Sequence, residues 1–240
     1  MTAGLEVGVI GLGAFGRLAA CHLDPHVDLL AHDAAVDAVD GIVCGSLEEV
    51  AARDVVILAV PVQLIGEVCR EIAPHVRPDA LVLDVASVKI EPMAQMRAHL
   101  PAATRIMGTH PLFGPQSAAD GVAGQSIVLC PGDGVDPACI AGFLRDNLRL
   151  DVHISDADTH DRTMASVQAL THLVSKVITD LALPIAPYTT RSYELLTQAA
   201  DLVAGDSDEL FRAIERHNPY AAALRARFFE AARALDGRLE

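Results

Sequence analysis

Two polar side chains, His110 and Ser87, directly follow apolar runs of the sequence and could do chemistry. His110 belongs to the segment Gly108-Thr-His110-Pro-Leu-Phe-Gly114-Pro. A histidine held between a strand end and a proline-rich turn has little freedom, which suits a general base. Ser87 follows the buried-looking run that ends at Asp84, where it could touch a substrate. A structural histidine and a helix-capping serine remain the alternatives.

Other polar residues are less constrained by their neighbours in the sequence. Lys89 could hold an anion or be solvated. Gln168 and His172 are one helical turn apart and share a face, although either could be a buried polar residue with its hydrogen bonds satisfied. Asp206 follows a glycine at the start of a helical stretch, where it is typical of an N-cap.

A glycine-rich segment near the N-terminus has the pattern of a dinucleotide-binding turn. It follows the first apolar run and opens an amphipathic stretch. The first glycine permits a tight turn, the second lets a pyrophosphate approach the backbone, and the third packs the helix on the strand. The alternative is a glycine turn that only packs a helix. The predicted contacts with the cofactor in this segment are Gly11, Leu12, Gly13, Ala14, Phe15 and Gly16.

Asp33 indicates which dinucleotide would bind. It lies about 20 residues past Gly11, where the fingerprint has an acid that binds the ribose hydroxyls. A carboxylate accepts hydrogen bonds from a 2′-hydroxyl and repels a 2′-phosphate, and Ala34 and Ala35 follow it rather than arginine. We therefore predict NAD in preference to NADP. We also predict a cofactor contact at Val60, where the third apolar run ends.

Short apolar runs alternate with amphipathic stretches up to about Ser155. Several runs are almost entirely apolar, as in strands that are buried on both faces. This alternation predicts an α/β domain with a Rossmann-like, doubly wound, mostly parallel sheet. The predicted strands are 5–10, 27–31, 55–60, 80–85, 105–108, 126–130 and 152–154.

The rest of the chain is typical of helices, predicted over 158–183, 188–204, 206–216 and 219–235. The sequence therefore predicts an NAD-binding domain over residues 1–155 and an all-helical domain over 156–240. So small a helical domain buries little surface by itself, which favours a homodimer formed through it. Phe228 and Phe229 are candidate interface residues, with an ordinary core role as the alternative.

The composition excludes several classes of protein. Acidic residues number 32 and basic residues 18, a net charge of −14, which argues against nucleic acid as a partner. A membrane span needs about 20 apolar residues, and the best run, 55–68, is interrupted by Pro61, Gln63 and Glu67. No signal peptide is evident.

The 5 cysteines include no Cys-x-x-Cys pair, which is typical of reduced thiols in a cytoplasmic protein. The histidines show no metal-ligand spacing, so we predict no metal.

Taken together, these segments resemble the prephenate/arogenate dehydrogenase family of tyrosine biosynthesis, from Val7 to about Leu235. The glycine fingerprint is generic, but the His110 segment combined with the His160–His172 segment is specific. The segments that carry the resemblance, besides the glycines, are Asp84-Val-Ala-Ser87-Val-Lys89, Thr109-His110-Pro-Leu-Phe-Gly114-Pro, His160-Asp-Arg162, Gln168-Ala-Leu-Thr-His172 and Tyr188-Thr-Thr-Arg191-Ser-Tyr.

The resemblance implies roles for individual residues. The family's catalytic histidine falls on His110 and its serine partner on Ser87. Its helix histidine matches His172, which would line the substrate pocket, and its carboxylate-binding arginine matches Arg191. The further predicted substrate contacts are Gln168, Thr109 and Asp206.

The resemblance also implies a reaction, the oxidative decarboxylation of a cyclohexadienol with hydride transfer to NAD. An acid at Asp206 resembles arogenate-preferring members, so we expect L-arogenate as substrate and L-tyrosine as product. Because the substrate is anionic and the chain acidic, Lys89, Arg191 and helix N-termini are expected to create a local positive potential.

Three alternatives remain open. The first is a prephenate dehydrogenase or a dual-specificity cyclohexadienyl dehydrogenase. The second is a β-hydroxyacid dehydrogenase, which would use a lysine of the helical half, where Lys176 is the only one. The third, from another class, is a non-catalytic NAD-sensing regulator.

Overall fold

The computed structural model describes residues 4–36, 38–183 and 186–239. The chain forms two compact units, Met1–His160 and Asp161–Glu240. Among the described helices, none is long and apolar enough to cross a membrane.

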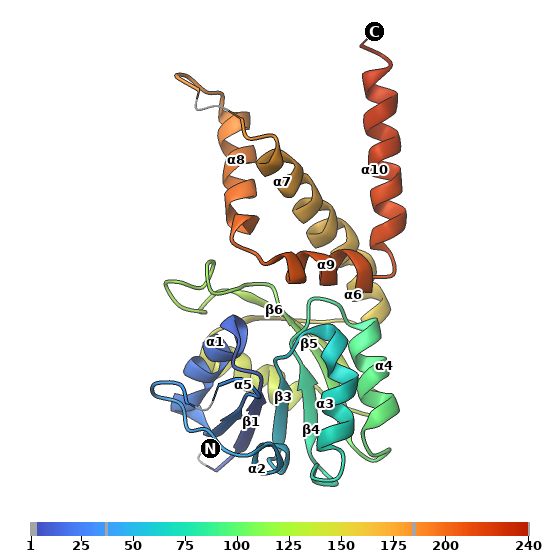
Figure 1. The fold of residues 1–240 in the computed structure, drawn as a ribbon. Helices are drawn as coiled ribbons and strands as arrows, with labels where there is room; N and C mark the ends of the chain where they lie inside the picture. Colours follow the sequence, from blue (N-terminus) through green and yellow to red (C-terminus); the bar gives the residue numbers. More distant parts are fainter. Residues whose placement is uncertain (1–3, 37, 184–185, 240) are drawn as a thin grey trace. The chain divides into compact units, whose positions relative to one another are not determined.

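In the described part of the chain, seven strands form one sheet in the order β2-β1-β3-β4-β5-β6-β7 (Figure 1). Neighbouring strands are parallel, except that β5 and β6 are antiparallel. The predicted Rossmann-like, mostly parallel sheet is therefore confirmed. The strands are β1 (Glu6–Ile10), β2 (Asp28–His32), β3 (Val55–Leu58), β4 (Leu81–Asp84), β5 (Arg105–Pro111), β6 (Ser126–Pro131) and β7 (Asp151–Ile154).

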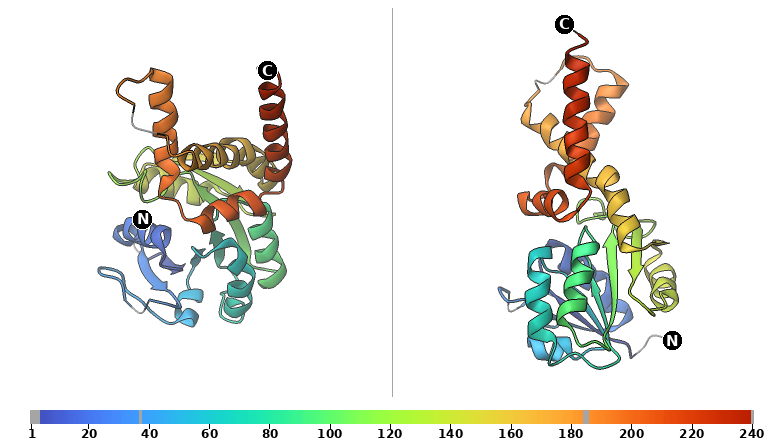
Figure 2. Two further views of the ribbon diagram at one scale, coloured as in Figure 1. Left: turned by 45° about the horizontal axis from the view of Figure 1, so that its top comes forward. Right: turned by 90° about the vertical axis from the view of Figure 1, so that its right-hand side faces the viewer.

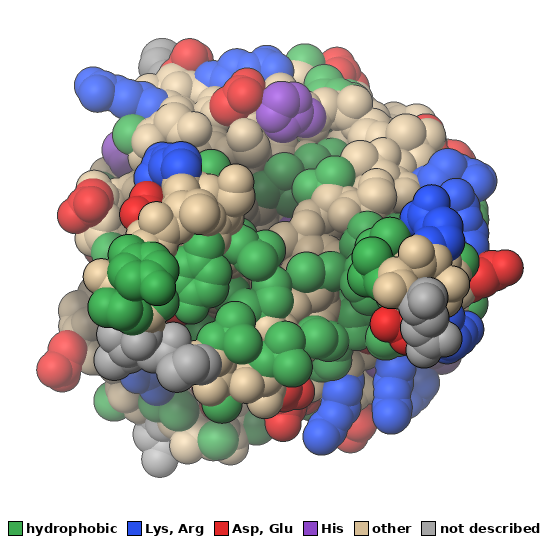
Figure 3. All heavy atoms as spheres, turned by 90° about the horizontal axis from the view of Figure 1, so that it is seen from above, with side chains coloured by type: hydrophobic (Ala, Val, Ile, Leu, Met, Phe, Trp, Pro, Cys, Tyr) green, Lys and Arg blue, Asp and Glu red, His purple; other side chains and the backbone are tan. Residues whose placement is uncertain are grey.

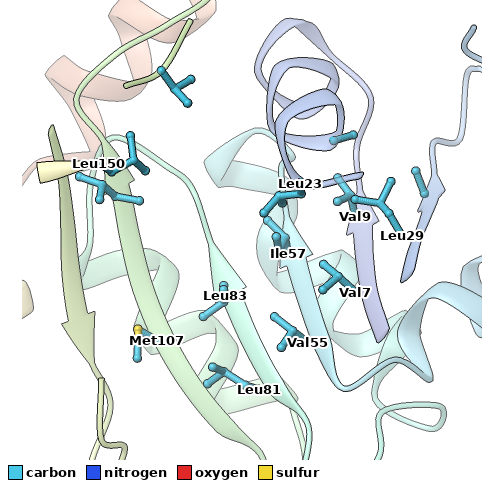
Figure 4. Close-up of a cluster of buried hydrophobic side chains, with 14 of the residues drawn as sticks. Val7, Val9, Leu23, Leu29, Val55, Ile57, Leu81, Leu83, Met107 and Leu150 are labelled. Atoms are coloured by element: carbon cyan, nitrogen blue, oxygen red, sulfur yellow. The ribbon is translucent and has the colours of Figure 1, made fainter. Parts of the chain in front are cut away.

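The central strands are apolar along their whole length because both of their faces are buried. Val56, Leu58 and Val82 are fully buried on one side of the sheet. The residues that alternate with them form a second buried layer on the other side (Figure 4). That layer includes Val7, Val9, Val55, Ile57, Leu81, Leu83 and Met107.

Helices cover both faces of the sheet, as a doubly wound fold requires (Figure 2, right). Helices α3 and α4 pack against each other on one face, and α1 and α5 pack on the other. The helices of this unit are α1 (Ala14–Leu23), α2 (Leu47–Ala51), α3 (Ile65–Ile72), α4 (Ile90–His99) and α5 (Ala138–Leu148).

The remainder of the chain is helical, as predicted. Helix α6 (Ala157–Met164) continues through a π-helical segment, Ala165–Ala169, into α7 (Leu170–Asp180), so the long helix predicted from residue 158 is interrupted by a widened turn. The other helices are α8 (Arg191–Ala204), α9 (Asp208–His217) and α10 (Ala221–Asp236).

Two of these helices begin later than predicted because a hydroxyl side chain caps each one. Thr190 accepts a hydrogen bond from the Tyr193 backbone N–H and so starts α8. Ser207 accepts one from the Leu210 N–H and starts α9. The predicted N-cap at Asp206 is therefore wrong, because Asp206 lies one residue before the capping position.

The second unit has a small buried core. Ala169, Ile214 and Ala221 form its buried cluster, with Leu210 packed against them. Many larger hydrophobic side chains of this unit are exposed instead, and Figure 3 shows hydrophobic side chains gathered on one face. The exposed ones are Val167, Val177, Leu181, Leu183, Tyr188, Leu195, Leu196, Leu202, Phe229, Leu235 and Leu239.

Candidate functional site: a dinucleotide turn and a buried histidine pair

The glycine turn joins β1 to α1 at the point where the strand order reverses. Gly11 has φ +101, a left-handed conformation that favours glycine, and a Cβ there would collide with the Ala59 carbonyl. A Cβ on Gly16 would collide with the Gly11 carbonyl. A Cβ on Gly13, by contrast, would meet no described atom within 4 Å. Packing thus requires the first and third glycines, whereas the second leaves the backbone at the start of α1 open to an anion.

Asp33 lies just beyond β2 and is tied to the glycine turn. Its Oδ2 accepts a hydrogen bond of 2.6 Å from the Leu12 N–H, and its Oδ1 accepts one of 2.8 Å from the Ala35 N–H. Partial burial by itself would raise the pKa of this carboxyl, but these hydrogen bonds outweigh it and the pKa is lowered. Asp33 is therefore an ionised acceptor beside the turn, which fits a ribose diol.

The other predicted cofactor residues surround the same turn. Leu12 is buried, and Ala14 is exposed at the first position of α1. Phe15 packs against Phe113, with ring centroids 6.1 Å apart. Val60 follows β3, and its Cγ1 lies 3.0 Å from where a Cβ on Gly11 would be. These positions fit the adenosine and pyrophosphate portions of a dinucleotide at the carboxyl edge of the sheet.

The register of β4 and β5 brings Ser87 and His110 to that same edge. Asp84, the last residue of β4, is paired with Gly108, and the chain leaves β4 toward Ser87 beside the end of β5. Ser87 is half-buried in this connection. The position before α4 is occupied by Lys89, and no side-chain cap is found there among the described residues. The alternative that Ser87 caps a helix is therefore wrong.

His110 lies inside β5 and not in a turn after it. The predicted strand ended at Gly108, but antiparallel pairing with β6 extends the ladder, with His110 opposite Val128 and Pro111 opposite Ile127. Only 3% of His110 is exposed. Its Nδ1 lies 2.9 Å from Nε2 of His160, which stands in α6. The strand thus fixes the backbone of His110, and a second histidine fixes its ring.

Behind His110, a buried lysine joins two strands. The Lys89 ammonium donates to Oδ1 of Asp84 in a short contact and, at 2.6 Å, to the Thr109 carbonyl. The Thr109 hydroxyl donates to the Asp84 carbonyl at 2.6 Å. A Cβ on Gly108 would lie 2.8 Å from Lys89 Cδ, so glycine makes room for the lysine stem. Thr109, a predicted substrate contact, thus has its hydroxyl bonded inside the protein.

This arrangement corrects the predictions for Lys89. The lysine is fully buried and paired, so it is neither solvated nor a source of positive potential at the surface. Burial raises the pKa of the Asp84 carboxyl, and the Lys89 ammonium opposes that shift. The sequence signal was an acid at the end of an apolar strand with a lysine in the following loop, but spacing gave no indication that both side chains turn inward.

In the second unit, His172 joins the π-helical segment to Asp206. Its Nδ1 lies 2.9 Å from the Gln168 carbonyl oxygen and its Nε2 lies 3.0 Å from Oδ2 of Asp206. A carbonyl oxygen only accepts, so Nδ1 carries a hydrogen. Either Nε2 carries one as well, which gives an imidazolium–carboxylate pair, or Asp206 holds the proton.

Gln168 and Arg191 differ in their surroundings. Gln168 Oε1 is buried with no hydrogen-bond partner among the described residues, so it is an available acceptor close to His172. Arg191 begins α8, where its side chain is 71% exposed and its guanidinium pairs with Glu194 at 3.3 Å. The structure therefore brings together Gln168, His172 and Asp206, whereas Arg191 has a surface partner of its own.

The sheet order, the glycine turn and Asp33 define a Rossmann-type nucleotide-binding domain. The sequence model of the prephenate dehydrogenase nucleotide-binding domain matches residues 26–148. The chain belongs to the prephenate dehydrogenase family, so the predicted resemblance is confirmed.

Curated relatives are dehydrogenases of this family. The chain is 28% identical over 185 residues to a probable arogenate/prephenate dehydrogenase of Methanocaldococcus jannaschii, which covers 72% of this chain and 41% of the relative. It is 28% identical over 233 residues to chloroplastic arogenate dehydrogenase 2 of Arabidopsis thaliana. This alignment covers 90% of the present chain and 65% of the relative. A cyclohexadienyl dehydrogenase of Zymomonas mobilis is 24% identical, covering 83% and 78%. The chain thus spans less than two thirds of the first two relatives.

Solved structures share the fold. Prephenate dehydrogenase from Aquifex aeolicus, in complex with hydroxyphenyl propionate and NAD+, aligns with a TM-score of 0.75 at 21% identity, covering 100% of this chain and 90% of that one. Arogenate dehydrogenase from Synechocystis aligns with a TM-score of 0.69 at 21% identity, covering 97% and 90%.

Proposed function

We propose that this chain catalyses the NAD-dependent oxidative decarboxylation of L-arogenate to L-tyrosine. The observation that carries the proposal is a buried histidine, His110, held at the carboxyl edge of the sheet that also bears the dinucleotide turn. Membership of the family and the names of the curated relatives support the reaction class. The same support applies to prephenate, which is the alternative substrate.

The nucleotide is proposed to be NAD, held by the Gly11–Gly16 turn and by Asp33. The pyrophosphate would lie over Gly13, where a side chain would occupy its space. The ionised Asp33 would accept hydrogen bonds from the ribose hydroxyls and repel the 2′-phosphate of NADP. When bound, NAD supplies the oxidising power by accepting a hydride from C4 of the substrate ring.

His110 and Ser87 are proposed to act on the C4 hydroxyl of the substrate. His110 accepts a hydrogen bond from this hydroxyl and takes up its proton as positive charge develops on the oxygen with departure of the hydride. The C1–carboxylate bond breaks, carbon dioxide leaves, and its electron pair completes the aromatic ring. The proton then returns to the oxygen, so the product is a phenol and no net proton is released. Ser87 orients the hydroxyl.

The His172–Asp206 pair is proposed to select the substrate side chain. Arogenate carries an ammonium and a carboxylate, whereas the keto acid of prephenate carries only the carboxylate. Asp206 would accept from the ammonium, together with Gln168 Oε1, which has no partner among the described residues, while His172 holds Asp206 in place through Nε2. An acid beside the amine favours arogenate and disfavours the keto acid.

Arg191 is proposed to hold the ring carboxylate by its two parallel N–H groups. Its present partner, Glu194, is an exposed neighbour one turn along the helix. Such surface pairs contribute about 0–1 kcal/mol, so an anionic substrate could displace Glu194 at little cost.

The second unit is proposed to form a homodimer. Its buried cluster is small and its long hydrophobic side chains are exposed, which a second copy of the same surface would cover (Figure 3). Phe228 and Phe229 of α10 contact each other, with ring centroids 5.4 Å apart, and Phe229 is 40% exposed.

The test of the function is the reduction of NAD and of NADP by the purified protein, with arogenate and prephenate offered separately. We expect kcat/KM to be highest for NAD with arogenate. Turnover mainly with prephenate would keep the mechanism and overturn the substrate assignment. NAD binding without turnover of either compound would favour the sensor, and no binding would overturn the proposed function as a whole.

A further inference from the structure

The chemistry proposed above gives no role to His160, whose ring contacts that of His110. The two rings meet edge to face, with centroids 5.1 Å apart and an interplanar angle of 68°. Nδ1 of His110 and Nε2 of His160 are separated by 2.9 Å, a hydrogen-bond distance. His160 is 2% exposed and His110 3%, so little water competes for this contact.

The backbone around His160 is fixed by a helix cap. Asp156 accepts hydrogen bonds from the Thr159 N–H and the Thr159 hydroxyl, both at 2.8 Å. The His160 N–H donates to the Asp156 carbonyl at 2.9 Å. The first turn of α6 is therefore held in place, and with it the direction in which the His160 ring points.

Two facing ring nitrogens can be 2.9 Å apart only if one of them carries a hydrogen. Either Nδ1–H of His110 donates to His160, or Nε2–H of His160 donates to His110. The second arrangement leaves the hydrogen of a neutral His110 on Nε2, where it would block acceptance of a proton from a substrate. The first leaves Nε2 without a hydrogen and so able to accept a proton, and only the first suits a base.

The contact also changes when His110 takes up a proton. An imidazolium carries hydrogens on both nitrogens, so its Nδ1–H still donates to Nε2 of His160. That hydrogen bond is then charge-assisted, and such bonds are roughly twice as strong as neutral ones. The buried surroundings increase the difference further, because the local dielectric is low. His160 thus stabilises the charged form of His110 more than the neutral form.

We propose that His160 is a positioning residue, which holds the His110 hydrogen on Nδ1 and directs Nε2 toward the reacting hydroxyl. His160 does not touch the substrate in this role and acts through His110. The arrangement corresponds to a base that is oriented by a third group. The inference rests on the proposed function for its catalytic consequence, but the tautomer itself does not depend on the substrate.

A double-mutant cycle measures whether His160 acts through His110. His110→Asn is expected to lower kcat about 10²–10⁴-fold. His160→Phe, which keeps an aromatic ring but no acceptor, is expected to lower kcat at least about 10-fold with little change in KM. In the His110→Asn background, His160→Phe should cost less than about 2-fold more, because groups that act as a unit are not additive.

Two further variants distinguish the loss of the hydrogen bond from a loss of the folded state. His160→Gln keeps an acceptor oxygen for Nδ1–H, so it should retain more activity than His160→Phe. His153→Phe is the matched control, because His153 lies in β7 of the same unit with its side chain 51% exposed. We expect its kcat to equal that of the wild type. Effects that add in the double variant, or equal losses for His160→Gln and His160→Phe, would overturn the proposal.

The tautomer of His110 can be determined by NMR, without a measurement of enzyme turnover. Long-range ¹H–¹⁵N NMR spectra distinguish a protonated from an unprotonated ring nitrogen in each histidine. We expect neutral His110 to carry its hydrogen on Nδ1 in the wild type and to shift toward Nε2–H in His160→Phe. Nε2–H in the wild type would overturn the inference. If the wild type turns over neither substrate, the proposed function fails, and these spectra still decide the tautomer.

Discussion

The first unit buries a lysine–aspartate pair completely, whereas the second unit exposes many of its larger hydrophobic side chains. Lys89 is fully buried in the first unit, where its ammonium donates to Asp84 and to the Thr109 carbonyl. The second unit has a buried cluster of Ala169, Ile214 and Ala221, and many of its larger apolar side chains are exposed. The first unit thus covers most of its apolar side chains within its own fold, whereas the second leaves many of them exposed.

In the proposed function, this difference separates two requirements. The proposed base, His110, must be held rigidly, and the first unit supplies partners for it: β6 for its backbone and His160 for its ring. The proposed recognition of the substrate side chain needs adaptable groups, and the second unit has pairs at its surface, Arg191–Glu194 and Lys176–Asp208. Stability should therefore depend on internal partners in the first unit and on a second copy in the other.

The largest predicted effect comes from breaking the buried pair. Lys89→Met leaves the Asp84 carboxyl buried without its cation, and loss of one partner of a buried pair costs about 3–5 kcal/mol. We expect urea unfolding to show a loss of that size in the first unit. Arg77→Met is the control, because the Arg77 side chain is 40% exposed and its pairs with Glu6 and Asp54 are worth about 0–1 kcal/mol.

The pH dependence of this variant has a definite sign. Burial raises the pKa of Asp84 above its ordinary value of 3.8, and the variant removes the ammonium that opposes the shift. A raised pKa in the folded state favours the protonated carboxyl. The contribution of Asp84 to the free energy of unfolding is therefore complete below pH 3.8 and is lost as the pH rises through the pKa of Asp84 in the folded state. The deficit of Lys89→Met should grow with pH; a constant deficit would contradict a buried, unpaired carboxyl.

The fold could be predicted from the sequence because its signals are local. Runs such as 55–60 and 80–85 are apolar throughout, and this pattern arises directly from burial on both faces of a parallel sheet. The strand predicted from residue 105 ends at 108, whereas β5 continues to Pro111, because residues 109–111 join the sheet only through antiparallel pairing with β6. That pairing depends on a strand some distance along the chain, which a local pattern does not report.

The second prediction concerns the polar pair of the second unit. Asp206→Asn removes the charge that is proposed to bind the substrate amine, so the ratio of kcat/KM for arogenate to that for prephenate should fall about 10-fold, equivalent to about 1.4 kcal/mol. Asp208→Asn is the matched control, because Asp208 is 75% exposed and pairs weakly with Lys176 at 3.5 Å. An unchanged ratio in Asp206→Asn would show that Asp206 only orients His172.

The site was predictable where a residue type and its place in a motif coincide. Glycine at 11 and 16 is required by close backbone contacts, and the motif reports both. The partners of side chains were not predictable: Asp206 bonds to His172 across 34 residues, and His110 bonds to His160 across 50. Nothing in the sequence near either residue specifies such a partner, because it is chosen by the packing of separate elements.

The third prediction concerns the uncovered surface. If a second copy covers α10, Phe229→Ser exchanges a large apolar side chain for a small polar one at the interface, where burial of phenylalanine is worth about 1.5–3 kcal/mol. In a two-fold symmetric dimer the change occurs twice. The dissociation constant measured by analytical ultracentrifugation should rise at least about 10-fold, and the unfolding midpoint at a fixed protein concentration should fall.

The control for this variant lies in the other unit. Leu64 is 41% exposed, against 40% for Phe229, so simple exposure of an apolar side chain is nearly the same. Because the proposed interface lies in the second unit, Leu64→Ser should leave the oligomeric state unchanged. An equal response of both variants would show that exposed apolar area alone governs association. A monomeric wild type would instead mean that the second unit is stable with its apolar face open, and the contrast between the units would then lie only in their polar groups.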